Sequence, residues 1–126
     1  HTGEFERLFG EPVTDRWEQA RAASDLTGKT VVLKGAGTVV ADPKYKMGIN
    51  MSGNPGMATG GSGDVLAGIL TALLCRYETA FEAATTAVHL HGLTGDIAAE
   101  RLTQESLIAT DIIDALPDAF RMIQFS

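Results

Sequence analysis

Apolar residues follow a helical spacing in the second half of the chain. Between residues 64 and 74 they recur three and four positions apart, which is the period of an α-helix. Alanines fill much of the remaining surface of this segment, so we expect a core helix that protein covers on most sides. The apolar positions are Val65, Leu66, Ile69, Leu70, Leu73 and Leu74.

A weaker amphipathic pattern runs over residues 15–24, with Trp17 and Ala20 on one side. We expect the tryptophan to be a buried anchor and not an exposed platform for a cofactor. The last helix is expected to start near Thr110, which is a suitable N-cap, with Asp111 in its first turn.

Residues 80–100 predict a further helix. Phe81 and Val88 share one face of it, and Gly92 and Gly95 would let a neighbouring segment approach closely.

Two short β-branched runs, at residues 30–33 and 39–41, flank the sequence Lys-Gly-Ala-Gly-Thr. This pattern predicts a buried strand, a tight glycine turn and a returning strand. The expected order is one helix, two strands, a loop and three helices. Neither a repeat nor a linker interrupts the sequence, so we expect one domain.

Glycine is concentrated in the middle of the chain, where eight of the 14 glycines lie between residues 35 and 63. Residues 53–64 form a glycine-rich loop that runs into the apolar helix. Such a loop directs unpaired N–H groups and the positive end of the helix dipole toward one point, which favours a bound phosphate. The loop lacks the Walker A pattern, and its surroundings do not fit a dinucleotide-binding fold.

Asp64 ends this loop, and its carboxylate admits two interpretations. It could be the base that removes a proton from an attacking hydroxyl beside the phosphate. It could equally charge the first turn of its helix and contribute about 0.3 to 1 kcal/mol to helix stability. The residues alone do not separate these two roles. Lys34 is likewise either a ligand or a solvated lysine at the end of a strand.

Composition narrows the class of protein. The chain has 126 residues, of which 44% are hydrophobic and 21% charged, and it carries a net charge of −6. These values predict one packed, soluble domain and argue against nucleic acid or an anionic membrane as a partner. The single Cys75 and the lack of a leader-like segment favour the cytoplasm.

Three residues receive plain structural interpretations. His89 and His91 are two positions apart and point to different faces of a helix, so they cannot share a metal ion, and we expect packing or capping roles. Cys75 is expected to be a small core residue and not a nucleophile.

Three segments together resemble one enzyme family. Gly-Asn-Pro-Gly-Met-Ala-Thr-Gly-Gly-Ser-Gly-Asp-Val-Leu-Ala-Gly at 53–68 is similar to the signature of the ADP- or ATP-dependent (S)-NAD(P)H-hydrate dehydratases, in the ribokinase-like superfamily. His-Thr-Gly-Glu-Phe at 1–5 and Val-Val-Leu-Lys-Gly-Ala-Gly-Thr at 31–38 resemble two further family segments in order and spacing. Thr2 stands where the family usually has proline.

The resemblance implies an α/β fold, the three-layer α/β/α sandwich of the ribokinase-like proteins. It also implies an activity, namely phosphorylation of the hydroxyl of hydrated NADH or NADPH from ADP or ATP, followed by loss of phosphate. Asp64 would then be the catalytic base at the hydroxyl. The implied anion hole comprises Gly61, Ser62, Gly63 and Asp64. The implied nucleotide-binding residues are Lys34, Gly35, Ala36, Gly37, Thr38 and Gly63.

Two implied contacts lie at the start of the chain. His1, with Asp64, would contact the hydrated substrate, and Glu4 stands where related kinases keep an acidic residue that orders Mg²⁺ through water. Family members are longer, so residues 1–126 are interpreted as the C-terminal part of a single domain. A half sheet with an open edge predicts self-association, so we also expect a homo-oligomer.

Two alternatives to this enzyme remain. A small-molecule hydroxyl kinase of the same superfamily would share the Gly-Ser-Gly-Asp sequence, although the Asn-Pro-Gly-Met-Ala-Thr lead-in favours the dehydratase. A chain that binds nucleotide without catalysis is the other alternative.

Overall fold

The computed structural model describes residues 13–57 and 60–124. A three-stranded antiparallel sheet lies between layers of helix, with the strands in the order β1-β2-β3. The strands are β1 (Val31–Leu33), β2 (Thr38–Ala41) and β3 (Met47–Asn50). Val32 pairs with Val40 across β1 and β2, and Val39 pairs with Ile49 across β2 and β3.

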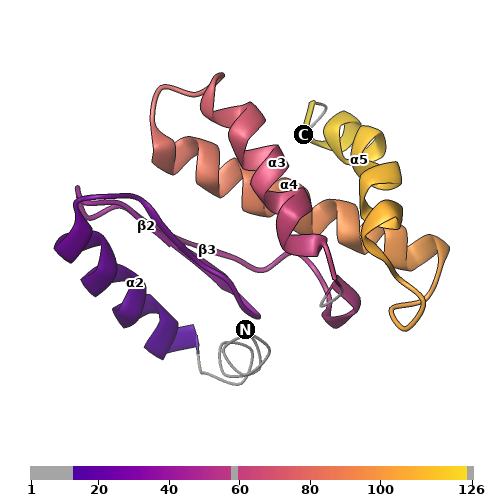
Figure 1. Ribbon diagram of the computed structural model, residues 1–126, viewed down its shortest axis with the longest axis horizontal. Helices are drawn as coiled ribbons and strands as arrows, with labels where there is room; N and C mark the ends of the chain where they lie inside the picture. Colours follow the sequence, from indigo (N-terminus) through magenta and orange to yellow (C-terminus); the bar gives the residue numbers. More distant parts are fainter. Residues whose placement is uncertain (1–12, 58–59, 125–126) are drawn as a thin grey trace.

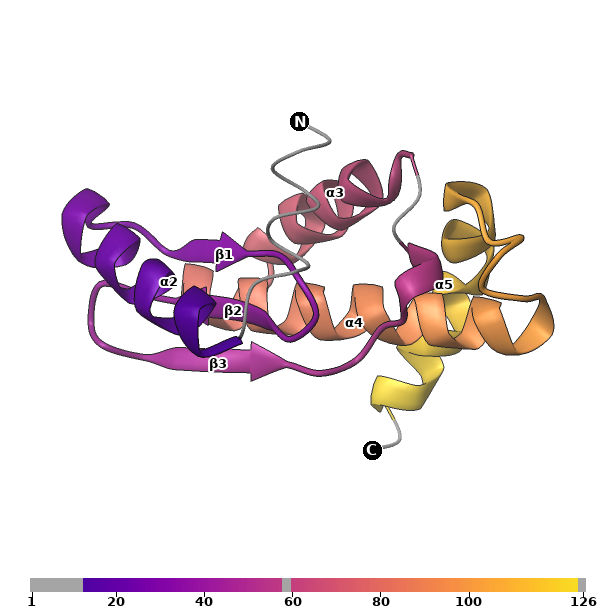
Figure 2. The ribbon, with the colours of Figure 1, turned by 90° about the horizontal axis from the view of Figure 1, so that it is seen from below.

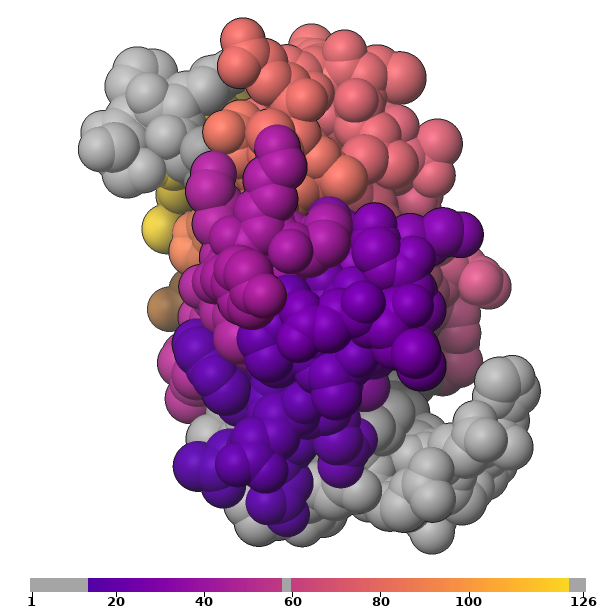
Figure 3. Space-filling view, turned by 90° about the vertical axis from the view of Figure 1, so that its left-hand side faces the viewer, coloured from indigo at the N-terminus to yellow at the C-terminus, as the bar shows by residue number. Residues whose placement is uncertain are grey.

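Helices cover both faces of this sheet. Helix α2 lies on one face and α4 on the other, which gives the three-layer arrangement that the resemblance implied (Figure 1, Figure 2). Figure 3 shows α2 and the strands forming one side of the molecule, with α3 and α4 behind them. The helices are α2 (Val13–Thr27), the short 3₁₀ helix η1 (Pro55–Met57), α3 (Ser62–Leu74), α4 (Ala80–Arg101) and α5 (Ala109–Gln124).

The strand residues alternate between the two faces. Val39 and Ala41 pack with Ala20 of α2, whereas Val40 belongs to the cluster formed with α3 and α4. Because successive side chains of a strand point to opposite faces, a buried strand of this kind must be apolar at consecutive positions. Val39, Val40 and Ala41 are all buried.

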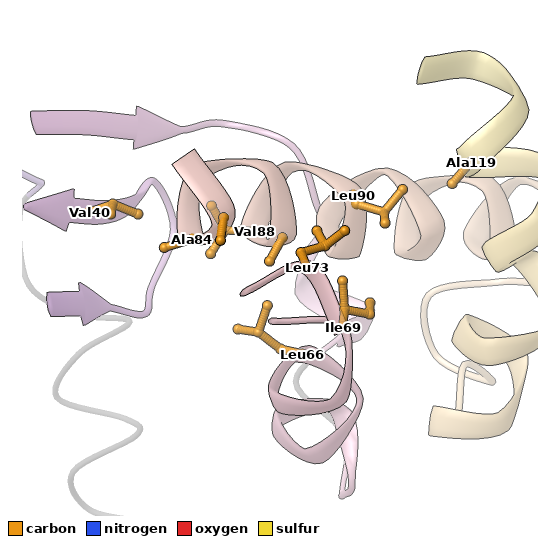
Figure 4. Packing of buried hydrophobic residues seen from close by; sticks show 10 residues of the cluster. Val40, Leu66, Ile69, Leu73, Ala84, Val88, Leu90 and Ala119 are labelled. Atoms are coloured by element: carbon orange, nitrogen blue, oxygen red, sulfur yellow. The ribbon is translucent and has the colours of Figure 1, made fainter. Parts of the chain in front are cut away.

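The larger core lies between α3, α4 and α5. Small residues of α4 let the helices approach closely, and the buried aliphatic side chains of α3 face them (Figure 4). Thr79 caps α4, where its hydroxyl accepts the N–H of Glu82 at 3.1 Å. The labelled members of this cluster are Val40, Leu66, Ile69, Leu73, Ala84, Val88, Leu90 and Ala119.

The expectation that protein covers α3 on most sides is wrong for this chain. Only one face of the helix is buried, because α4 and α5 pack against that face alone. Ala67 and Ala72 are exposed, and Leu74 is 47% exposed. Cys75, which caps the C-terminus of α3, is also exposed and is not a core residue.

The anchor of α2 is not the tryptophan. Trp17 is 37% exposed, and the buried positions of α2 are Arg16, Ala20 and Ser24, spaced four residues apart. The prediction was wrong because it assigned the buried face from apolarity. The buried face of α2 instead carries a polar side chain that reaches the turn after β1.

One strand and one helix boundary also differ from those expected. Strand β3 was not predicted, because its sequence Met-Gly-Ile-Asn contains two poor strand formers. Helix α5 starts at Ala109, which places Thr110 within its first turn and not at the N-cap. The cap is reversed, since the carboxylate of Asp111 accepts the N–H of Ile108 at 2.9 Å.

No helix within residues 13–57 and 60–124 is both long enough and apolar enough to span a membrane.

Candidate functional site

A cavity of about 290 Å³ opens between the sheet, α3 and α4. Two loop segments, the start of one helix and one face of another surround it. These are the turn 34–38 between β1 and β2, the segment 50–57 that follows β3, the first residues of α3, and the face of α4 that carries Val88, His91 and Gly92.

A side chain of α2 holds the turn between β1 and β2 in place. The buried guanidinium of Arg16 donates to the carbonyl oxygens of Ala36 and Gly37. Gly37 has a positive φ of 76°, and a Cβ on Gly35 would lie only 2.8 Å from Nε of Arg16. The hydroxyl of Thr38 donates to the carbonyl of Gly35 at 3.1 Å and closes the turn. Glycine is therefore required at residue 35 by the close approach of Arg16 and at residue 37 by the positive φ.

The segment that follows β3 is bound to α4 along its length. The side-chain amide of Asn50 donates to the carbonyl of Val88 at 3.0 Å, and the hydroxyl of Ser52 donates to that of His89 at 3.1 Å. The carboxylate of Asp96 accepts the backbone N–H of Gly53 and the side-chain amide of Asn54.

The two helix glycines make this contact possible. A Cβ on Gly92 would collide with Ser52, and a Cβ on Gly95 would collide with the side chain of Met57. The prediction that these glycines permit a close neighbour is confirmed, and the neighbour is the loop at residues 50–57.

Helix α3 begins at the cavity without a side-chain cap. Gly61, at the N-cap position, has a positive φ of 88° and makes no capping hydrogen bond with a side chain. The first N–H groups of an α-helix have no partner within the helix, and the helix dipole is positive there. A Cβ on Gly63 would lie 3.0 Å from Nζ of Lys34, so this lysine closely flanks the start of the helix.

One side chain of α4 contacts the start of α3. Nε2 of His91 lies 3.2 Å from the buried hydroxyl of Ser62. Burial lowers the pKa of His91 below its ordinary value of 6.5. A hydrogen bond with the backbone of Ser62 opposes this shift, and the charge of Lys34 adds to it. The ring is therefore neutral at pH 7.

The structure brings most of the predicted site residues together. Those that line the common cavity are Lys34, Gly35, Ala36, Gly37, Thr38, Ser62 and Gly63. Gly61 and Asp64 adjoin this lining in the chain, and the side chain of Asp64 is exposed. His1 and Glu4 lie outside the described residues.

Three polar residues of the site were missed or misjudged from the sequence. Arg16 was overlooked beside Trp17, His91 was assigned an ordinary packing role, and Asp96 was not considered. The signal for two of them was present, because Gly92 and Gly95 mark where the backbone of α4 meets another segment. A polar side chain next to such a contact is well placed to bind that segment.

Within residues 13–57 and 60–124, no group of three or more His, Cys, Asp or Glu side chains could hold a metal ion. Mg²⁺ is commonly held by one or two carboxylates together with water and substrate phosphates, and does not require a cage of protein ligands. The exposed carboxylate of Asp64, which adjoins the uncapped start of α3, fits that mode of binding.

Comparisons with known proteins agree with this geometry. The sequence model of the family described as NAD(P)H-hydrate dehydratase matches residues 1–118. The "Bifunctional NAD(P)H-hydrate repair enzyme Nnr" of Thermofilum pendens is 47% identical over 128 residues, which cover 98% of this chain and 24% of that protein.

Two solved structures share the fold. The ADP/ATP-dependent NAD(P)H-hydrate dehydratase of Bacillus subtilis, co-crystallized with ATP/Mg²⁺, has a TM-score of 0.83 at 34% identity, over 95% of this chain and 45% of that one. A ribokinase-like superfamily protein of Enterococcus faecalis has a TM-score of 0.74 at 35% identity, over 94% and 41%. The chain spans about a quarter of the first relative and less than half of each of these two proteins.

Proposed function

Because the chain belongs to the NAD(P)H-hydrate dehydratase family, we propose that its protein converts hydrated NADH and NADPH back to NADH and NADPH. ADP or ATP would be the phosphoryl donor. The observation that carries this proposal is the shared cavity, where the turn 34–38 and the uncapped start of α3 lie together. The reaction requires a nucleotide and a transferring phosphate to occupy adjacent places.

The reaction has two chemical steps. In the first, the ring hydroxyl of the hydrate attacks the terminal phosphorus of the nucleotide, loses its proton to Asp64, and releases AMP from ADP or ADP from ATP. In the second, the ring C–O bond breaks, phosphate leaves, and the adjacent ring carbon loses a proton to form the double bond. Asp64 suits the first step because its exposed carboxylate adjoins the anion loop.

We assign the nucleotide and the transferring phosphate to different parts of the cavity. The turn 34–38, with Gly63, would hold the AMP portion. The backbone N–H groups of residues 61–64 would receive the transferring phosphate, since they carry the partial positive charge of the helix N-terminus. Lys34 belongs to the turn, and its Nζ closely approaches Gly63 at the start of α3, where its charge would complement phosphate.

Bound Mg²⁺ would neutralise negative charge on the phosphates. We propose that Glu4 orders this ion through water and that His1 contacts the hydrated ring. Both assignments rest on the match of residues 1–5 to the family.

We further propose that residues 1–126 form the C-terminal part of one ribokinase-like domain. The chain's share of its relatives supports this proposal, and so does an apolar groove of about 150 Å³ between β1, α3 and α4. Val32, Ala67 and Leu70 line this groove, beside a sheet edge at β1. The intact mass of the native protein tests the proposal, because a polypeptide no larger than 13.3 kDa would contradict it.

Assembly and location complete the proposal. We expect a homo-oligomer, and we expect the isolated 126 residues to self-associate through the open edge of β1. Sedimentation equilibrium tests this expectation, and a well-folded monomer at micromolar concentration would contradict it. We place the protein in the cytoplasm, where a single exposed thiol such as Cys75 stays reduced.

The enzymatic proposal is tested with hydrated NADH, ADP and Mg²⁺. The absorbance of the dihydropyridine should return in step with release of AMP when the full-length protein is added. Turnover with a different hydroxyl substrate, and none with the hydrate, would instead identify a small-molecule kinase. Binding of ADP without any turnover would identify a non-catalytic nucleotide-binding protein.

A further inference from the structure

Ser62 occupies an unusual position in the loop that starts α3. Residues 60, 61 and 63 are all glycine, so Ser62 supplies the only side chain in this stretch. Glycine leaves a backbone free to adopt many conformations, and fixing such a segment costs entropy. The position of the first N–H groups of α3 therefore depends on what holds Ser62.

His91 is the side chain that contacts it. Its Nε2 lies 3.2 Å from the hydroxyl of Ser62, and the two residues are 29 positions apart in the sequence. Only 6% of Ser62 is exposed, and both residues line the same cavity. His91 itself is carried by α4, a 22-residue helix in the core, so the contact ties the glycine-rich loop to a rigid element.

We propose that His91 is a positioning residue for phosphoryl transfer: by holding Ser62, it fixes the N–H groups of residues 61–64 that receive the transferring phosphate. This inference rests on the proposed function, because that function places the phosphate at these groups. The AMP portion of the nucleotide is held elsewhere, by the turn 34–38, which Arg16 fixes independently.

The division between the two parts of the cavity gives a sharp test. The ratio of the dissociation constants of AMP and ADP measures the contribution of the terminal phosphate. Loss of the contact between His91 and Ser62 should raise the dissociation constant of ADP about tenfold, as expected when a hydrogen bond to a charged group is misplaced. The dissociation constant of AMP should change by no more than about twofold. A general loss of folding would weaken both nucleotides and lower the melting temperature.

The chain provides a matched control on the same helix. His89 is exposed and lies two positions from His91, on a different face of α4, so His89→Leu makes the same chemical change away from Ser62. His91→Gln is the conservative variant, because its terminal amide can reach the place of Nε2 and still hydrogen-bond Ser62.

The experiment compares His91→Leu, His91→Gln, His89→Leu and Ser62→Ala in the full-length protein, by calorimetric titration with AMP and with ADP. We expect His91→Leu and Ser62→Ala to lose the preference for ADP, His91→Gln to recover at least a third of it, and His89→Leu to keep it. The double variant that combines His91→Leu with Ser62→Ala should lose no more of the preference for ADP than His91→Leu alone, since the two residues act through one contact.

Two results would overturn the inference. One is a ratio unchanged in both His91→Leu and Ser62→Ala. The other is a full loss of the preference for ADP when His91→Leu is added to a protein that already carries Ser62→Ala. Should His91→Leu fail to fold, Ser62→Ala and His91→Gln decide the question. These titrations contain no hydrated cofactor, so an inactive wild-type protein would contradict the proposed function and leave the test of His91 intact.

Discussion

The carboxylate of Asp96 accepts the backbone N–H of Gly53 at 2.9 Å, and these residues are 43 positions apart in the sequence. Its second oxygen accepts the side-chain amide of Asn54, also at 2.9 Å. A single side chain of α4 thus fixes two consecutive residues of a loop that lines the cavity. Charged acceptors form stronger hydrogen bonds than neutral ones, which makes Asp96 an effective clamp.

Asp96→Asn should loosen this clamp, because an amide offers one acceptor and one donor where two acceptors are needed. We expect a loss of about 1 to 3 kcal/mol in the free energy of unfolding and weaker binding of ADP. Urea unfolding and calorimetric titration measure the two effects. Glu100→Gln, an exposed position on the same helix, is the control and should change neither quantity.

Glycines at Gly92 and Gly68 should respond in opposite directions to alanine. A Cβ on Gly92 would lie 2.7 Å from the backbone carbonyl carbon of Ser52, whereas a Cβ on Gly68 meets nothing within 4 Å. Gly92→Ala should therefore cost about 1 to 3 kcal/mol through overpacking. Gly68→Ala should stabilise α3 by about 0.5 to 1 kcal/mol through helix propensity. Thermal unfolding measures both, and equal effects of the two substitutions would contradict the close packing of Ser52 on α4.

Arg16→Met should damage the turn 34–38 from the opposite side of the sheet. The substitution keeps an apolar stem but removes the donors to the carbonyl oxygens of Ala36 and Gly37. Leaving such acceptors without a partner costs about 1 to 3 kcal/mol each where they are buried. The affinity for AMP and the free energy of unfolding, measured with urea, should both fall. Trp17→Ala, at the exposed neighbouring position, should leave the affinity for AMP unchanged.

The sequence was most informative where local pattern and backbone chemistry agree. The helical periods of α3 and α4, and the strand, glycine turn and strand at residues 30–41, depend on nearby residues, so they could be predicted. The close-approach role of Gly92 and Gly95 could be predicted for the same reason. Strand β3 depends on pairing with β2 and not on its own composition, so its Met-Gly-Ile-Asn sequence gave no signal.

The candidate site divides along the same line. Its glycine-rich segments are continuous in sequence and could be identified, but the polar side chains that hold them come from other elements. Arg16 reaches the turn from α2, and His91 and Asp96 reach the loops from α4, over separations of 20 to 43 residues. Nothing in the spacing of such residues indicates the partner, because the partner is chosen by tertiary packing.

Protonation of His91 should make stability depend on pH. Its pKa in the folded protein is lowered from 6.5, chiefly by burial, so the unfolded chain binds a proton at a higher pH than the folded one. Between these two values the unfolded state holds more protons, and the free energy of unfolding falls as the pH falls. Urea unfolding from about pH 7.5 to about pH 5 should therefore show a decline below about pH 6.5 that His91→Gln reduces. An identical pH dependence in both proteins would contradict the burial of this ring.

Asp64→Asn should abolish most turnover and leave nucleotide binding equal or slightly stronger. The amide cannot accept the proton of the attacking hydroxyl, and loss of a general base typically costs about 10² to 10⁴ in rate. It also removes a negative charge beside the start of α3, where a phosphate would bind, so repulsion of the nucleotide decreases.

The alternative role of Asp64, as a charge in the first turn of the helix, predicts a different pattern. In that case the variant would lose about 0.3 to 1 kcal/mol of stability and keep its rate. Return of dihydropyridine absorbance from hydrated NADH, measured beside ADP affinity in the full-length protein, separates the two roles. A rate within about threefold of wild type would exclude Asp64 as the base, because so small a change is below the contribution of any general base.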